Sequence, residues 1–307
     1  MILTICPNPS VDCTIELDNL NVGMLNRINN KVETYSGKAL NVAVGVSRLS
    51  EKSFATGFMF QAHRTLFEET LKNNGVKYRF VVNPGAARVN YKIIDKKSML
   101  TEINDRGEEV SRANQLKLIK LVAELSKKCN VAVMSGSVPK GVDSGFYREV
   151  LSVIPESVKK IVDTEKDNMT EALKCGVYMV KPNLREFQAF VGEEVKSISD
   201  IPALSGKYLR HGVKLVLVSL GASGAVLTDG KQSYYCKSAN VAVNSTVGAG
   251  DSMVAAASIG IEKGLPLDEI LKMSVAAGTA SITTSGTNLF YKDKYEEIYS
   301  KIFSVKV

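Results

Sequence analysis

The stretch Val131-Ala-Val-Met-Ser-Gly-Ser137 decides the fold class, because a short apolar run is followed at once by a polar turn. The same order recurs in Ile161-Val-Asp-Thr164, Val177-Tyr-Met-Val-Lys-Pro-Asn183 and Leu215-Val-Leu-Val-Ser-Leu-Gly221. Segments of helical period separate these runs, so each connection has room for a crossover helix. The pattern predicts an α/β fold with a parallel sheet that helices cover on both faces.

The polar turns predict where this sheet binds its ligands. Turns that follow consecutive parallel strands lie together at the carboxyl edge of the sheet. Open α/β sheets bind ligands along that edge. We therefore expect the functional site where these turns meet.

Toward the carboxyl end the pattern becomes helical, from Asp251 to Lys263 and from Leu267 onward.

Two stretches depart from this pattern, at about residues 11–35 and 86–104. Both alternate in strand fashion. In the second stretch, Arg88–Ile94 and Ser98–Asn104 have turn residues at their bounds and no helix between them. They predict a small antiparallel β-sheet that stands off the main domain. A small sheet with one face uncovered needs a lid function or a partner chain. Extra edge strands of the main sheet are the alternative.

The overall composition of the chain predicts a single globular domain over residues 1–307. Hydrophobic residues make up 45% and charged residues 23%, with no internal repeat or linker. No apolar run approaches the roughly 18–20 residues that span a bilayer, and Met1–Cys6 lacks the features of a signal peptide. The five cysteines are dispersed, which suits a reducing compartment. We expect a cytoplasmic protein that does not bind a membrane.

Charge and histidine content narrow the classes of function. Lys and Arg number 39 against 32 Asp and Glu, a net charge of +7 that favours anionic ligands. No Lys/Arg block or basic amphipathic helix occurs, so small phosphorylated ligands are favoured over nucleic acid. His63 and His211 are the only histidines. A His-based zinc site and a Ser-His-Asp hydrolase are both disfavoured.

The segment Ser245–Ala256 carries the sharpest chemical signal. Gly248-Ala-Gly250 brings bare backbone N–H groups together, and the helix that follows directs the positive end of its dipole to the same place. This arrangement holds an anion. Asp251 would lie beside that anion, where a carboxylate can accept the proton of an attacking hydroxyl during phosphoryl transfer. A plain helix start with an Asp cap is the alternative.

Two further segments suit a sugar or phosphate ligand. In Ser36–Ala43 a glycine turn precedes a helix, where Lys38 can meet a phosphate and Asn41 can bond sugar hydroxyls. In Asn8–Asp12 a carboxylate after a Pro turn can bind two vicinal hydroxyls. A solvated lysine with a packed asparagine, and an Asx turn, are the respective alternatives. Neither a Walker-A motif nor a protein-kinase glycine loop occurs, and no dinucleotide fingerprint follows the first strand.

Six segments in order resemble the ribokinase-like sugar kinases of the phosphofructokinase-B family, and most of all the branch of 1-phosphofructokinase and tagatose-6-phosphate kinase. They are Asn8–Asp12, Gly37-Lys38 with Asn41, Ser135–Gly141, Val180–Glu186, Ser219–Gly224 and Thr246–Ser252. The resemblance implies a ribokinase-like three-layer α/β/α main domain with a β-sheet lid. It also implies a homodimer joined through the lids.

The resemblance further implies roles for individual residues. Asp251 matches the catalytic base, and Gly248, Ala249 and Gly250 match the anion hole. Substrate-binding positions are matched by Asp12, Gly37, Lys38, Asn41 and Arg88, with Arg27 as a further candidate. ATP-binding positions are matched by Lys181, Asn183, Glu186, Ser219, Gly221 and Gly224. Glu186, with Asn183, is expected to help organise Mg²⁺ through water.

By this resemblance the chain is a kinase that uses ATP and Mg²⁺ to phosphorylate a ketose phosphate, either fructose 1-phosphate or tagatose 6-phosphate. Fructose 6-phosphate, an unphosphorylated sugar or a nucleoside are alternative acceptors. A non-catalytic sugar-phosphate or nucleotide sensor is an alternative of another class. The chain departs from the family pattern at Ala39, Phe58–Arg64, Asp163–Lys166 and Ala87. These departures bear on the identity of the sugar.

Overall fold

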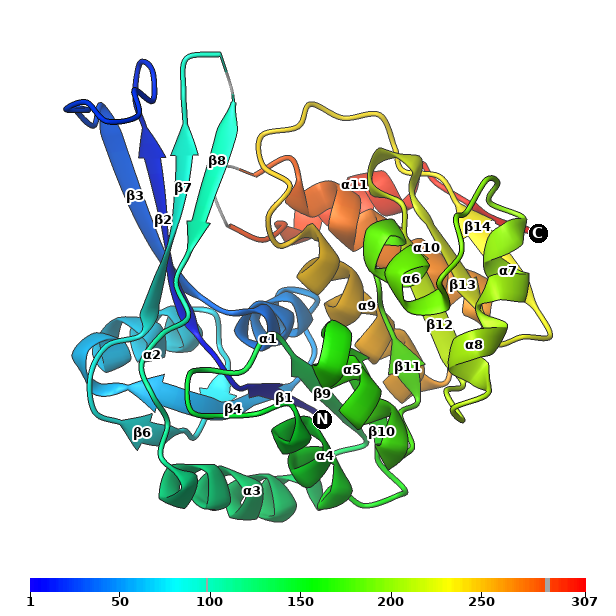
Figure 1. Cartoon of the computed structure of the whole chain (residues 1–307). Helices are drawn as coiled ribbons and strands as arrows, with labels where there is room; N and C mark the ends of the chain where they lie inside the picture. The colour runs from blue at the N-terminus through cyan, green and yellow to red at the C-terminus, as the bar shows by residue number, and fades with distance from the viewer. Residues whose placement is uncertain (98, 285–287) are drawn as a thin grey trace.

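The computed structural model describes residues 1–97, 99–284 and 288–307. Ser98, the first residue of one predicted strand, lies outside the described residues. The chain forms a large layered domain from which a smaller sheet rises at one side (Figure 1). This arrangement confirms the α/β fold class with a separate lid.

The main sheet has the strand order β15-β14-β13-β12-β11-β10-β9-β1-β4-β5, and β6 pairs with the end of β4. Its strands are β1 (Ile2–Cys6), β4 (Ser53–Phe60), β5 (Lys77–Tyr78), β6 (Val81–Asn83), β9 (Val131–Ser135), β10 (Lys159–Asp163), β11 (Met179–Val180), β12 (Leu215–Ser219), β13 (Ala225–Thr228), β14 (Ser233–Cys236) and β15 (Ser304–Lys306). The four apolar runs of the sequence are β9 to β12, and they pair in parallel as predicted.

The predicted parallel pairing does not extend to one edge of the main sheet. There β12, β13, β14 and β15 pair in antiparallel fashion. The connection between β12 and β13 spans only residues 220–224, and that between β13 and β14 only residues 229–232. Such short connections leave no room for a crossover helix, so the chain turns back as hairpins.

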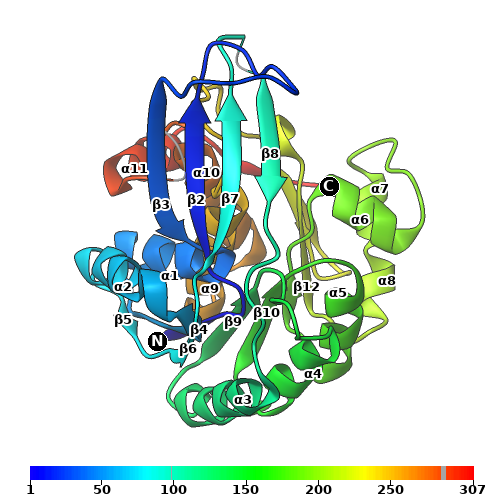
Figure 2. The same cartoon turned by 60° about the vertical axis from the view of Figure 1, so that its left-hand side comes forward.

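Helices cover both faces of the main sheet. On one face lie α1 (Lys38–Arg48), α9 (Ala249–Lys263), α10 (Leu267–Ser281) and α11 (Lys292–Tyr299). The other face carries α3 (Arg112–Ser126), α4 (Gly145–Ser152), α5 (Lys166–Ala172), α6 (Leu184–Val191), α7 (Asp200–Leu204) and α8 (Gly206–Leu209), as Figures 1 and 2 show together. Near the β5 edge, α2 (Arg64–Asn73) packs against β5. Among the helices of the described residues, none combines the length and the apolar character that crossing a membrane requires.

The close approach of α1 and α9 positions the site. A Cβ atom on Gly45 of α1 would lie 2.8 Å from the Cβ of Ala255 on α9, so the two backbones meet where only small side chains fit. Residues 251–261 of α9 are all buried, which is typical of a helix packed on several sides. This packing brings the first turns of α1 and α9 together at the carboxyl edge of the sheet.

The lid sheet has the order β3-β2-β7-β8, with β2 (Ser10–Glu16), β3 (Asn30–Ser36), β7 (Arg88–Ile94) and β8 (Leu100–Asn104). It is separate from the main sheet and stands upright from it in Figure 2, so the alternative of extra edge strands is wrong. The outer pairs are antiparallel, but β2 and β7 run parallel, which corrects the prediction of a wholly antiparallel lid. Both strands follow parallel strands of the main sheet, β1 and β6, and leave the domain in the same direction.

Candidate active site

A cavity of about 980 Å³ lies between the lid and the carboxyl edge of the main sheet. Its volume is that of a pocket for a small-molecule ligand. The predicted site residues that line it are Asp12, Gly37, Lys38, Asn41, Arg88, Lys181, Asn183, Glu186, Ser219, Gly221, Gly224, Gly248, Ala249, Gly250 and Asp251. Arg27 is exposed in the loop between β2 and β3 and does not line the cavity. The chain therefore gathers all the predicted site residues except Arg27 in one place.

The N-terminus of α9 forms one wall of the cavity. Gly248 caps the helix in the left-handed conformation, with φ of +80°, and a Cβ at this position would lie 2.8 Å from Leu289. The backbone N–H groups of the first helical turn have no partner within the helix. A Cβ on Gly250 would lie 3.2 Å from the ammonium of Lys181, so a positive charge stands directly beside these amides. This wall is suited to hold a phosphoryl group.

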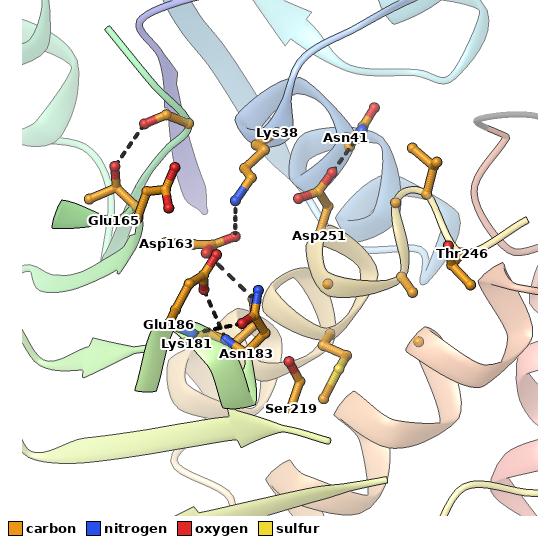
Figure 3. Close-up of a pocket in the computed structure, with 18 of the residues that line it drawn as sticks. Lys38, Asn41, Asp163, Glu165, Lys181, Asn183, Glu186, Ser219, Thr246 and Asp251 are labelled. Carbon is orange, nitrogen blue, oxygen red and sulfur yellow. Dashed lines mark hydrogen bonds and ion pairs between the residues drawn. The ribbon is translucent and has the colours of Figure 1, made fainter. Parts of the chain in front are cut away.

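The carboxylate of Asp251 is buried at the same helix end. The amide of Asn41 on α1 donates a hydrogen bond of 2.8 Å to it (Figure 3). Burial raises the pKa of Asp251 to about 6, and the charge of Asp163 acts in the same direction. The charges of Lys38 and Lys181 and the bond from Asn41 oppose this rise. With a pKa near neutral, Asp251 can accept a proton from a reacting hydroxyl at physiological pH.

A second buried carboxylate, Asp163 at the end of β10, lies between two lysines. Its oxygens are 3.5 Å from the ammonium of Lys38 and 3.6 Å from that of Lys181. Burial alone would raise the pKa of Asp163, but the two lysines outweigh it and hold the pKa below its ordinary value. Asp163 in turn raises the pKa of Lys38. Sequence reasoning noted Asp163 as a polar residue after a strand but gave it no role; its place directly after a buried run was the available signal.

Asn183 and Glu186 form a capping box at the start of α6. The side chain of Asn183 accepts a hydrogen bond from the backbone N–H of Glu186, and Glu186 Oε2 accepts one from the backbone N–H of Asn183, both at 2.9 Å. Each residue therefore has a structural function as well as a place in the cavity wall. The capping box holds the Glu186 carboxylate at a fixed position with its other oxygen, Oε1, free of this motif.

The donor set at this wall fits a hydrated Mg²⁺ rather than a metal caged by protein. In the described parts of the chain, no group of three or more His, Cys, Asp and Glu side chains is arranged to hold a metal ion. Magnesium usually keeps several waters and binds proteins through one or two carboxylates together with substrate phosphates. Glu186 offers one such carboxylate, so the residues fit a hydrated ion that binds together with a phosphate ligand.

The third wall contains a tight turn and apolar side chains. Ser219 is the last residue of β12, and Gly221 and Gly224 lie in the turn that follows it. At Gly224, φ is +94° and a Cβ would lie 2.0 Å from the carbonyl oxygen of Cys236, so only glycine fits. Sequence reasoning missed the apolar residues that line the cavity together with this turn, which are Val243, Met253, Val275 and Ile282. They offer a surface for a flat, weakly polar group such as a nucleobase.

The lid supplies the fourth wall. The guanidinium of Arg88 donates to the carbonyl oxygens of Asn8 at 3.3 Å and Asp105 at 3.5 Å. Asn90 and Lys92, two and four residues further along β7, also line the cavity and were missed. The signal was present in the sequence, because alternate residues of a strand share a face. Arg88 on this face therefore predicts that positions 90 and 92 face the same ligand.

Comparisons with known proteins agree with this geometry. A sequence profile described as pfkB family carbohydrate kinase matches residues 8–294. Tagatose-6-phosphate kinase of Staphylococcus epidermidis is 30% identical over 311 residues, with 100% of both chains covered. The 1-phosphofructokinase of Borreliella burgdorferi is 30% identical over 282 residues, with 92% of this chain and 91% of the relative covered. The solved structure of phosphofructokinase-2 from Escherichia coli in complex with substrates and products is 27% identical, with a TM-score of 0.91 and 98% of both chains covered.

Proposed function

Because the chain belongs to the pfkB family of carbohydrate kinases, we propose that it transfers the γ-phosphoryl group of ATP to a hydroxyl of a phosphorylated ketose. Fructose 1-phosphate and tagatose 6-phosphate are the proposed acceptors, since relatives over the whole chain are named 1-phosphofructokinase and tagatose-6-phosphate kinase. The observation that carries the proposal is the buried carboxylate of Asp251 at the amide-lined start of α9, with Lys181 beside it.

In the proposed reaction Asp251 serves as the base. The acceptor hydroxyl attacks the γ-phosphorus, its proton passes to Asp251, and the bond from this phosphorus to the bridging oxygen breaks to release ADP. Asn41 orients the carboxylate through its hydrogen bond. The backbone N–H groups of Gly248, Ala249 and Gly250 stabilise the charge on the transferring group.

Lys181 is the proposed partner for the phosphates of the nucleotide. Lys38 and Lys181 both pair with Asp163, which holds the two ammonium groups close to the first turn of α9. Glu186 and Asn183 would hold Mg²⁺ through water, and this ion would neutralise phosphate charge when it is bound. The turn from Ser219 to Gly224 is the proposed contact for the remainder of ATP.

Arg88 is the proposed partner for the phosphate that the sugar already carries, together with Lys38. Its guanidinium bonds only to carbonyl oxygens, and among the described residues it forms no ion pair with a carboxylate. Its buried Nε has no hydrogen-bond partner in the described structure. An unneutralised guanidinium in a cavity wall favours a phosphate ligand, because arginine can bind it through two parallel hydrogen bonds.

We further propose a homodimer in which a second copy of the chain covers the lid sheet. On the face away from the cavity, Tyr91 is 41% and Ile103 56% exposed, and the loop between β2 and β3 exposes Val22, Met24 and Leu25. A sheet with exposed apolar residues and free edges needs a partner.

The five cysteines are free, as a protein of the reducing cytoplasm requires, and this supports a cytoplasmic location.

The test is an ADP-release assay with ATP and a panel of sugars. The panel contains fructose 1-phosphate, tagatose 6-phosphate, fructose 6-phosphate, their unphosphorylated parents and nucleosides. We expect the highest kcat/KM with fructose 1-phosphate or tagatose 6-phosphate, and a bisphosphate product identified by mass spectrometry. Turnover of the parent sugars alone would overturn the proposed acceptor. Binding of ATP without turnover of any compound in the panel would favour a sensor instead.

A further inference from the structure

Donor groups of the protein occupy every hydrogen-bonding position of the Asp12 carboxylate. Its Oδ1 accepts hydrogen bonds from the hydroxyl of Ser10 at 3.2 Å and the amide of Asn90 at 3.0 Å. Its Oδ2 accepts one from the hydroxyl of Ser36 at 2.8 Å and lies 3.2 Å from the ammonium of Lys92. Each carboxylate oxygen has about two lone-pair sites, so all four are taken. A sugar hydroxyl that donates to Asp12 must therefore displace one of these donors.

Lys92 is a buried lysine in the cavity wall. It is 7% exposed and lies on the cavity face of β7, in alternation with Arg88 and Asn90. Lysine is almost never fully buried unless it is paired. Replacing a buried ion pair by apolar groups of similar volume is often neutral or stabilising. Stability alone therefore gives little reason for a lysine here, whereas contact with a ligand does.

Among the four donors to Asp12, Lys92 is the one that can leave. Ser10, Ser36 and Asn90 have short side chains that the strands hold in place, and removing them would leave buried polar groups unsatisfied. Lys92 has a flexible four-carbon stem and carries its charge with it. A sugar hydroxyl that replaces the ammonium on Asp12 keeps the carboxylate fully hydrogen-bonded. The exchange changes no covalent bond.

The charges of the lid wall indicate that the released ammonium of Lys92 would bind the phosphate of the ligand. A phosphate dianion in this wall meets the carboxylates of Asp12 and of Glu102, which lies opposite Lys92 in the register of β7 and β8. Both repel it. Besides Lys38 on α1, the lid itself supplies two positive charges on the cavity face of β7, Arg88 and Lys92. Lys92 forms no ion pair with Glu102 in the described structure, where Asp12 is its partner.

We propose that Lys92 is a specificity-determining residue that selects phosphorylated over unphosphorylated ketoses. A hydroxyl of the sugar takes the place of the ammonium on Asp12, and the ammonium binds the phosphate of the same molecule together with Arg88. Only a ligand that carries both groups satisfies Asp12 and Lys92 at once. This inference rests on the proposed function and names a determinant of its acceptor.

The test compares Lys92→Met with Lys92→Arg in steady-state kinetics. For the ketose phosphate that wild type uses best, K92M is expected to raise KM by about tenfold or more, the loss of roughly one charged hydrogen bond. For the parent ketose, KM or the inhibition constant is expected to change by less than about threefold, because that ligand has no phosphate to lose. K92R keeps the charge and is expected to retain most of the selectivity.

A matched control separates the cavity from the lid as a whole. Lys31 is an exposed lysine of the same sheet that pairs with Glu33, on the face away from the cavity. Lys31→Met is expected to leave the selectivity unchanged. If K92M does not fold, the double variant D12N/K92M removes both buried charges together. In this variant the KM for the ketose phosphate is still expected to rise toward the KM for the parent ketose, so that the preference for the phosphorylated sugar is lost.

Three results would overturn the inference in an enzyme whose wild type phosphorylates a ketose phosphate. These are an unchanged KM in K92M, an equal loss for both ligands, and the same effect in K31M. Absence of any turnover of ketose phosphates by wild type would instead overturn the proposed acceptor, and this inference with it. The wild-type panel therefore tells the two failures apart.

Discussion

The amide of Asn41 donates a hydrogen bond of 2.8 Å to the carboxylate of Asp251, although 210 positions separate the two residues in the sequence. This contact joins the first turns of α1 and α9 in the wall of the cavity. It fixes the carboxylate beside the amides that are proposed to hold the transferring phosphoryl group. The pair is the centre of the proposed mechanism, and the first predictions concern it.

Asp251→Asn is expected to lower kcat by about 10²- to 10⁴-fold, the usual contribution of a general base. The substituted amide still accepts the bond from Asn41 through its oxygen, so the geometry of the site persists. The KM for ATP, or the binding of ATP measured by calorimetry, is expected to change little. Turnover at the wild-type rate would remove Asp251 from the role of base.

The same variant is expected to be more stable than wild type at pH 8. The folded-state pKa of Asp251, about 6, lies above the ordinary value of 3.8, so the ionised carboxylate destabilises the fold above pH 6 and ceases to do so as it is protonated. Asn carries no charge and avoids this cost at any pH. Thermal unfolding at pH 8 and pH 5 checks the sign: the gap between the two proteins should narrow at pH 5.

The activity of wild type is expected to depend on the ionisation of Asp251. With a pKa of about 6 for this carboxylate, kcat/KM should be level above pH 7 and fall by about tenfold per pH unit well below pH 6. The phosphate of a sugar phosphate also titrates near pH 6, so its own pKa is measured by ³¹P resonance and corrected for. A corrected profile that is level from pH 5 to 8 would contradict the assignment.

Gly250→Ala tests the closeness of the amides and Lys181. The new Cβ would lie 3.2 Å from the Lys181 ammonium and force it to shift. A small misplacement of a group that holds a phosphoryl oxygen is expected to lower kcat/KM by about 10- to 100-fold. Gly206→Ala is the matched control, because its Cβ would meet its nearest neighbour, Arg210, at an ordinary 3.6 Å. Equal effects in both variants would mean that the substitution acts on folding.

Arg88→Ala and Lys38→Ala test the proposed phosphate contacts. Each is expected to raise KM for a ketose phosphate by about 10- to 100-fold, the loss of a hydrogen bond between charged groups. For an unphosphorylated ketose, R88A is expected to leave KM nearly unchanged. K38A is expected to reduce kcat as well, because Lys38 also pairs with Asp163, which pairs with Lys181, the proposed partner of the nucleotide phosphates. Equal losses by R88A for both ligands would place Arg88 outside phosphate recognition.

Ile103→Glu tests the proposed dimer. Ile103 is 56% exposed on the lid face away from the cavity, and a carboxylate there would be costly to bury against a second copy. Light scattering after size exclusion is expected to give a dimer for wild type and a monomer for I103E. Leu116→Glu, at an exposed apolar position of α3, serves as control and should remain dimeric. A monomeric wild type would contradict the proposal directly.

The sequence by itself determined the layers of the main domain, and every site residue that it predicted except Arg27 lines the cavity. The apolar runs at 131–134, 161–162 and 215–218 lie in strands, as do the last two residues of the run at 177–180, and the segment from Asp251 to Lys263 is helical. These features can be predicted locally, because the spacing of apolar residues along a short segment distinguishes a strand from a helix. The ribokinase-like fold and the kinase family, which the motifs implied, are confirmed by the comparisons.

Only the tertiary structure decided which distant residues meet. Asp163 lies between Lys38 and Lys181, and Asp12 forms an ion pair with Lys92. No local sequence pattern predicts these contacts. The parallel pairing of β2 with β7 likewise follows from where both strands leave the main sheet. Such contacts arise from packing between segments that lie far apart in the sequence. A buried charge reveals its function only when its partner is known, because the partner sets its ionisation and its freedom to bind a ligand.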